Sequence, residues 1–238
     1  MSRRVKLIRK LKFFLFSIRI HRIIPGRSLL FISHLSLLSK WIASQGRPGY
    51  SDFPTRKFDY DRRYNLYKYI IDKELNNEDI DYFEFGVAKG TSFRWWMENI
   101  TSGNSKFYGF DTFTGLPEDW GPFKKGDMSG GNEVPQIDGS RHQFFQGLFQ
   151  KTLHGFLKTY SGGRRKVILM DADLYTSTLY VLTMMSPWIQ KGDIVIFDEF
   201  NVPLHEFKAF REWTEACYIK YTVIAEANNY YHVAIRIE

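Results

Sequence analysis

Short apolar runs and longer amphipathic segments alternate along most of the chain. The runs are rich in β-branched and aromatic residues, which is typical of buried strands. Strands are therefore expected at 82–85, 106–110, 143–146, 167–170 and 194–197. Between them, apolar residues near helical spacing predict helices at 60–75, 91–101, 150–159, 176–189 and 204–217.

This alternation indicates how the main part of the chain is organised. Strands that alternate with helices are typical of an α/β domain, in which helices flank a mostly parallel sheet. Two more strands, 221–225 and 231–237, are expected to complete the sheet as a hairpin. We therefore expect a single α/β domain over residues 51–238.

Residues 1–50 follow a different pattern, in which Arg19 and Arg22 interrupt the apolar clusters. No apolar run approaches the roughly 18 residues of a membrane span, and the interrupting arginines argue against a signal peptide. Two interpretations remain open. Residues 1–45 could form an amphipathic helical segment on a membrane surface, or a helical cap that packs on the main domain and helps to form its substrate pocket, and the two interpretations are compatible.

Charge divides the chain at the same place. Residues 1–50 contain eleven Lys or Arg and no Asp or Glu, whereas the rest of the chain contains 22 basic and 26 acidic residues. The net charge of +7 therefore belongs to the N-terminal segment. A nucleic-acid partner would require basic residues on a folded face of the main domain, so we expect none. A connector at 45–50 separates the two parts.

Length and cysteine content exclude other classes of protein. A chain of 238 residues with 44% hydrophobic residues can fill the core of one α/β domain. Its single cysteine, Cys217, excludes an intramolecular disulfide framework and a multi-cysteine zinc site. We expect Cys217 to be a small buried side chain on the last helix.

A glycine turn follows the first strand of the main domain. Glu84 stands two residues before Gly86, and Gly90 and Ser92 lie where the next helix begins. Glycine has no Cβ, so a ligand can approach the backbone closely. The G-x-G-x-x-G spacing of a dinucleotide site is missing, which favours a ligand without a pyrophosphate, such as S-adenosylmethionine. Its expected contacts are Glu84, Gly86, Gly90 and Ser92.

Asp111 ends the second strand, about twenty-five residues after the glycine turn. In open α/β sheets, ligands bind at the carboxyl ends of the strands, and an acid at this position can accept hydrogen bonds from both ribose hydroxyls. The alternative is that Asp111 only caps the turn after its strand. Two glycines and an acid at this spacing favour a nucleoside site.

Three carboxylates stand at the ends of two later strands. Asp171 follows the apolar run 167–170, and Asp198 and Glu199 follow the run 194–197. Neighbouring carboxylates repel one another, and a divalent cation such as Mg²⁺ would remove the repulsion. Such a cation could also bind an acceptor oxygen and lower its pKa. The alternative is that these acids cap the helices that follow.

Five motifs, in this order along the chain, resemble the macrocin O-methyltransferase family. They are Phe83-Glu84-Phe85-Gly86, residues 109–117 (GFDTFTGLP), residues 147–153 (GLFQKTL), Asp171-Ala172-Asp173-Leu174-Tyr175 and Phe197-Asp198-Glu199. The resemblance covers roughly residues 60–235. It implies a Rossmann-like class I methyltransferase fold with a seven-stranded sheet, and S-adenosylmethionine as the donor. Because this family methylates sugar hydroxyls on macrolides and related glycosides, it also implies a sugar hydroxyl as the acceptor.

The resemblance also implies roles for particular residues. Gly147 and Phe149, in the third motif, are expected at the donor site. Asp171, Asp198 and Glu199 match the positions of the Mg²⁺ ligands in the family. Many relatives carry Asp-Asp where this chain has Asp198-Glu199, and the longer glutamate changes the reach of the last ligand.

A sugar hydroxyl is a weak nucleophile near neutral pH and needs a base, a metal or both. His205 follows the last acidic pair closely and is the first candidate for the base, with a structural role at a helix start as the alternative. Asp173 and Tyr175 are the second candidates.

A long segment, 112–141, holds nine Gly or Pro in thirty residues and shows no apolar period. Structureless connections of this length within a compact domain are usually functional. We interpret the segment as a lid over donor and acceptor, with Trp120 and Phe123 as walls of the pocket.

Two other functions stay open. An NAD-dependent sugar oxidoreductase would share the α/β pattern, although the dinucleotide glycine pattern does not occur in the sequence. A catalytically inactive, membrane-associated binding protein would explain the basic N-terminus but leaves the strand-end carboxylates without a purpose.

The favoured interpretation also predicts partners and location. The acceptor is expected to be a small-molecule glycoside or a lipid-linked glycan. The protein is expected to be cytoplasmic, with peripheral contact of residues 1–45 at the inner membrane face. The sequence leaves the oligomeric state open, and a homo-oligomer is one of the possible states.

Overall fold

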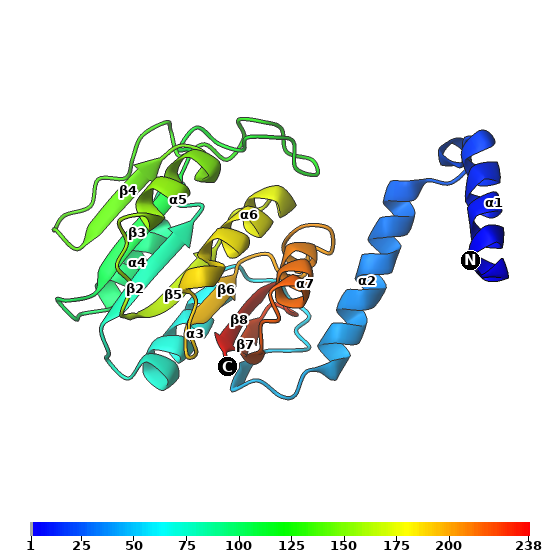
Figure 1. Ribbon diagram of the computed structural model, residues 1–238. Coiled ribbons are helices and arrows are strands. Elements are labelled where there is room, and N and C mark those ends of the chain that lie inside the picture. Colours follow the sequence, from blue (N-terminus) through cyan, green and yellow to red (C-terminus); the bar gives the residue numbers. More distant parts are fainter. Residues whose placement is uncertain (1) are drawn as a thin grey trace.

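A single mixed sheet organises the computed structural model, which describes residues 2–238 (Figure 1). Its eight strands follow the order β1-β7-β8-β6-β5-β2-β3-β4, and β8 alone among them runs antiparallel to its neighbours. The strands are β1 (Tyr50–Ser51), β2 (Ile80–Phe85), β3 (Lys106–Asp111), β4 (His142–Gln146), β5 (Arg165–Met170), β6 (Ile194–Phe197), β7 (Tyr221–Ala227) and β8 (His232–Ile237). The predicted, mostly parallel sheet and its terminal hairpin are confirmed. The eighth strand, β1, is a two-residue strand at the end of the predicted connector.

Helices cover both faces of this sheet. These helices are α3 (Arg62–Tyr69), α4 (Thr91–Asn99), α5 (Phe149–Leu157), α6 (Tyr175–Met185) and α7 (Glu206–Ala216). Two more helices, α1 (Arg3–Ser17) and α2 (Gly26–Ser44), precede them in the N-terminal segment. Three short helical segments complete the set: η1 (Ile20–Arg22), the π-helix η2 (Ile70–Leu75) and η3 (Ser186–Trp188). The helix predicted at 60–75 is thus α3 continued by η2, and the other four predicted helices in the main domain lie within a few residues of the observed ones.

The apolar runs at the centre of the sheet are explained by burial on both faces. Phe83 and Phe85 of β2 point to the face covered by α5, α6 and α7, whereas Tyr82 points to the face covered by α3 and α4. Because neither face meets water, successive strand residues can all be apolar. The same alternation holds in β5 and β6.

The helix α2 packs on the main domain through its last part. Leu38 is buried there, and the Trp41 ring lies 4.7 Å from the ring of Phe200. The Trp41 indole N–H also donates a hydrogen bond of 2.9 Å to Tyr221 Oη. No residue of α1 is buried, and α1 stands beyond the far end of α2, away from the sheet (Figure 1). None of the helices within residues 2–238 has the length and apolar character needed to cross a membrane.

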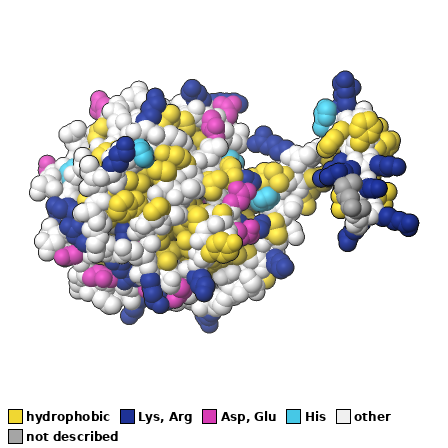
Figure 2. Space-filling view, viewed as in Figure 1, with side chains coloured by type: hydrophobic (Ala, Val, Ile, Leu, Met, Phe, Trp, Pro, Cys, Tyr) yellow, Lys and Arg dark blue, Asp and Glu magenta, His cyan; other side chains and the backbone are white. Residues whose placement is uncertain are grey.

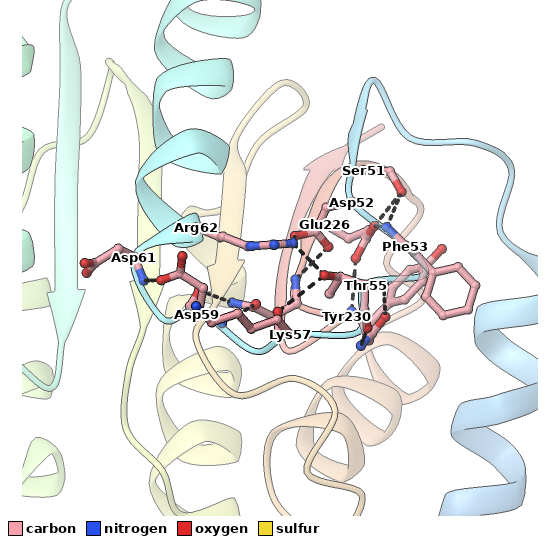
Figure 3. A network of polar contacts seen from close by, with 12 residues as sticks. Ser51, Asp52, Phe53, Thr55, Lys57, Asp59, Asp61, Arg62, Glu226 and Tyr230 are labelled. Atoms are coloured by element: carbon pink, nitrogen blue, oxygen red, sulfur yellow. Dashed lines mark hydrogen bonds and ion pairs between the residues drawn. The ribbon is translucent and has the colours of Figure 1, made fainter.

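A network of hydrogen bonds fixes the chain between α2 and α3 against the terminal hairpin (Figure 3). The buried carboxylate of Glu226 accepts hydrogen bonds from the backbone N–H groups of Phe53 and Tyr230, at 2.9 and 3.0 Å. Arg62 Nη1 lies 2.7 Å from a carboxylate oxygen of Asp52. A buried, charged acceptor with several donors is a strong constraint on the backbone, so this network sets where α3 begins.

Cys217 is exposed, and the prediction of a buried thiol is wrong. The buried face of α7 ends with Trp213, one helical turn earlier, and the helix stops at Ala216. Helical spacing therefore does not extend to Cys217.

Candidate active site

A cavity of about 520 Å³ opens at the carboxyl ends of β2, β3 and β5. There β2 pairs with β3 on one side and with β5 on the other, although β5 follows much later in the chain. This is the point where the strand order reverses, which is the usual ligand site of an open α/β sheet. No described residue of the N-terminal segment (2–50) lines this cavity, so α2 packs on the domain without forming the pocket.

The glycine turn after β2 forms one wall. Gly86 has φ of +99°, and a Cβ built on it would lie 1.6 Å from the carbonyl oxygen of Asp171. The Gly86 N–H donates a hydrogen bond of 3.0 Å to the Phe110 carbonyl. The backbone therefore admits only glycine at this position, because a side chain has neither the space nor the favoured φ.

Asp111 holds this turn to the end of β3. One carboxylate oxygen accepts hydrogen bonds from the N–H groups of Val87 and Ala88, both at 2.7 Å. The other accepts the N–H of Phe113 at 2.6 Å. The first oxygen uses both of its lone pairs in this way, whereas the second has only this N–H and a long contact of 3.4 Å from Thr112 Oγ1, and Asp111 lines the cavity. The two interpretations of Asp111 are thus compatible: the residue caps a turn and also faces the ligand space.

Glu84 is buried beneath the glycine turn. Its carboxyl accepts a hydrogen bond of 2.5 Å from Tyr82 Oη. Burial raises the pKa of Glu84 to about 8, although the hydrogen bond from Tyr82 opposes the shift. Five of the seven residues predicted for the donor line the cavity: Glu84, Gly86, Ser92, Asp111 and Phe149. The other two, Gly90 and Gly147, stand beside lining residues without lining the cavity themselves.

Acidic side chains form the opposite wall, where Asp171, Asp173 and Glu199 line the cavity. Burial raises the pKa of Asp171 well above its usual range, and the negative charge of Asp198 raises it further. Burial, together with the charges of Asp198 and Asp111, raises the pKa of Asp173 to about 7. Burial, with the charge of Asp173, raises the pKa of Glu199 to about 8. Such crowding of carboxylates is typical of functional sites.

Asp198 lies behind this wall with partners of its own. Tyr60 Oη donates a hydrogen bond of 2.5 Å to one of its oxygens, and Arg63 Nη1 and His232 Nδ1 lie 3.7 and 3.2 Å from the other. Burial favours the protonated form of Asp198, but the interactions with His232, Arg63 and Tyr60 outweigh it and hold the pKa below its usual value.

Sequence reasoning missed Tyr60 and Arg63, both of which line the cavity. A signal was present, because Arg63 stands three and four residues before Leu66 and Tyr67, which are buried. Helical spacing places all three on one face of α3. An arginine on an apolar helix face indicates a buried anion, which here is Asp198.

In the described part of the chain, the predicted Mg²⁺ ligands are not grouped as a metal site. Across residues 2–238, no three or more His, Cys, Asp or Glu side chains are grouped so that they could hold a metal ion. Asp198 is already paired with Arg63, and Glu199 accepts a hydrogen bond of 2.5 Å from Tyr231 Oη. Hard oxygen ligands suit Mg²⁺, so the metal site stays a prediction.

The three candidates for the base are placed differently. Asp173 lines the cavity, whereas His205 and Tyr175 do not. Burial lowers the pKa of His205, and the positive charge of Arg27 lowers it further. Tyr175 Oη points to α7, where it donates a hydrogen bond of 2.5 Å to Glu212.

The segment 112–141 covers the glycine turn, as a lid would. Leu116, Met128 and Ser129 line the cavity, and a Cβ on Gly130 would lie 2.7 Å from the Ala88 carbonyl oxygen. Trp120 and Phe123 stack on each other with ring centroids 5.2 Å apart, and they pack with Leu116 and Leu174. Trp120 and Phe123, which were predicted to be walls of the pocket, do not line the cavity. They form instead the small core of the lid and keep this loop compact.

Comparisons with known proteins agree with this geometry. Residues 83–200 match the family model described as a methyltransferase domain. The calicheamicin methyltransferase CalS11 is similar in structure, with a TM-score of 0.57 and 19% identity over 86% of this chain and 91% of that one. The O-methyltransferase NovP is also similar in structure, with a TM-score of 0.55 and 17% identity over 88% of this chain and 98% of that one. Among curated protein sequences no match is found.

Proposed function

We propose that this chain, whose residues 83–200 match a methyltransferase domain, is an S-adenosylmethionine-dependent methyltransferase that methylates a hydroxyl group, and that this hydroxyl belongs to a sugar. One observation carries the proposal: a single cavity joins a nucleoside-binding turn to a wall of carboxylates. The first end suits the donor, and the second suits an acceptor rich in hydroxyl groups. The name of CalS11 as a TDP-rhamnose 3'-O-methyltransferase supports a sugar acceptor by analogy.

At the donor end, Asp111 would accept hydrogen bonds from the ribose hydroxyls of S-adenosylmethionine. The glycine turn at Gly86 lets the donor lie against the backbone. Glu84, beneath the turn, would bind the ammonium group of the methionine part, whose positive charge would favour the ionised carboxylate. Residues of the lid, Met128 and Ser129 among them, would close over the donor and exclude water.

We expect Asp111→Ala to weaken the binding of S-adenosylhomocysteine by about 100-fold, since hydrogen bonds to a charged group are worth roughly 1.5–3 kcal/mol each. Isothermal titration measures the change. The control is Asp138→Ala, which removes an exposed acid from the lid. Wild-type affinity in a folded Asp111→Ala protein would show that Asp111 only caps the turn.

At the acceptor end, we propose Asp173 as the general base. It would accept the proton of the sugar hydroxyl as the hydroxyl oxygen forms a bond to the methyl carbon. The bond from carbon to sulfur breaks, and its electron pair stays on the sulfur. Holding the oxygen in line with that carbon supplies much of the rate, and Tyr60 and Arg63 at the same wall would orient the sugar.

The sequence also predicted assistance by Mg²⁺. No step of the mechanism proposed here is routed through a metal ion. Asp173 and the orientation of the acceptor carry the chemistry.

Transfer of a labelled methyl group from S-adenosylmethionine tests the proposal. The acceptors would be nucleotide-activated deoxysugars, lipid-linked saccharides and, as controls, the same sugars with the hydroxyl already methylated. We expect the label in a sugar ether, identified by mass spectrometry. Label on an amine or a carboxylate would contradict O-methylation, and reduction of NAD would favour the oxidoreductase.

A further inference from the structure

The helix α1 carries an apolar stripe that nothing in the described chain covers. Leu7, Leu11 and Phe14 follow one another at helical spacing, and they are 69%, 55% and 57% exposed. Ile8 is exposed beside this stripe. Single exposed apolar residues are ordinary, but a stripe along about two helical turns indicates an interaction surface.

Cations lie on the other sides of the same helix, together with the exposed Phe13 and Phe16. With 100° per residue, Lys6, Lys10 and Lys12 fall outside the arc formed by Leu7, Leu11 and Phe14. The first acidic residue of the whole chain is Asp52, far from α1. In Figure 2, the face of α1 in view shows apolar and basic side chains and no acidic ones.

The beginning of α2 extends this surface. Leu29, Phe31 and Ile32 are exposed there, and only the last part of α2 is packed on the main domain. The two helices therefore expose apolar side chains at a distance from the sheet (Figure 1).

We propose that α1 and the beginning of α2 form a docking surface for an anionic membrane. The stripe enters the boundary between head groups and acyl chains, and the lysines contact the anionic head groups. Charge complementarity selects this occupant. A nucleic acid would engage the lysines and leave Leu7, Leu11 and Phe14 in water. A second copy of the chain would bring its own α1, which carries the same lysines and no acidic residue to pair with them.

Vesicle sedimentation with the full-length protein tests the surface directly, and its result does not depend on catalysis. The vesicles are phosphatidylcholine alone, or phosphatidylcholine with about one-third phosphatidylglycerol. We expect binding to the anionic vesicles only, and weaker binding as salt rises.

Two triple variants separate the contributions. Leu7→Gln/Leu11→Gln/Phe14→Gln removes the stripe, and Lys6→Glu/Lys10→Glu/Lys12→Glu reverses the charges. Each should weaken binding at least about tenfold. The matched control, Lys158→Glu/Lys191→Glu/Lys220→Glu, makes the same change of charge at exposed positions of the main domain and should bind as wild type.

Three results would overturn the proposal. Binding that depends on the lysines but not on the stripe would indicate a general polyanion site. An equal loss in the control would indicate attraction by net charge alone. A wild-type oligomer that the stripe variant converts to monomers, with vesicle binding unchanged, would assign the stripe to a second copy of the chain.

Discussion

Replacing Gly86 with alanine should cost about 3 kcal/mol or more of the free energy of unfolding. The new methyl group would meet the Asp171 carbonyl oxygen, 1.6 Å from the ideal Cβ position, and φ of +99° is unfavourable for alanine. Two strands carry these atoms, so relief would require β2 and β5 to separate. Because the same atoms form the cavity, donor binding should be lost as well.

Urea denaturation measures the effect, with Gly155→Ala as the control. Gly155 lies in α5 with nothing within 4 Å of its ideal Cβ, so alanine there should stabilise the protein slightly, by about 0.5–1 kcal/mol. If Gly86→Ala unfolds like the wild type and binds S-adenosylhomocysteine normally, this description of the turn is wrong.

Asp173→Asn should lower the rate of methyl transfer by about 10²–10⁴-fold, the usual contribution of a general base. Asparagine keeps the size of the side chain and tolerates the φ of +56° at this position. It also removes one charge from a crowded set of carboxylates, so the stability of the fold should not fall. Affinity for S-adenosylhomocysteine should stay near the wild-type value, because Asp111 and the glycine turn are unchanged.

The matched controls are the two other candidates. His205→Gln and Tyr175→Phe should leave the transfer rate within a few-fold of wild type, because neither side chain lines the cavity. If His205→Gln lowered the rate of methyl transfer as much as Asp173→Asn, His205 and not Asp173 would be the better candidate for the general base. That result would also imply that the lid and α7 move when the acceptor binds.

The architecture could be predicted from the sequence because the central strands are buried on both faces. Runs such as Val167–Met170 are continuous and apolar for that reason, and they locate the strands almost to the residue. The strand β1 was missed because it pairs through two residues only and carries no apolar run. Its position depends on the network around Glu226, which joins residues about 175 apart in the chain.

The position of a candidate site residue could be predicted from the sequence where that residue stands directly at the end of a strand. Gly86, Asp111 and Asp173 each stand one to three residues after a strand or at its last residue, so the sheet brings them together. His205 follows β6 by eight residues, and the loop between them decides where the ring points. Arg63 comes from α3, and only the packing of that helix brings it to Asp198.

The most direct test of the account is calorimetric titration of the purified protein with S-adenosylhomocysteine, with and without Mg²⁺. The proposed donor site consists of backbone groups, Asp111 and Glu84, and none of these is a candidate metal ligand. We therefore predict one site per chain, an affinity on the order of micromolar, and the same value in both buffers. No binding in either buffer, or binding of NAD in its place, would contradict the assignment of this cavity to a methyl donor.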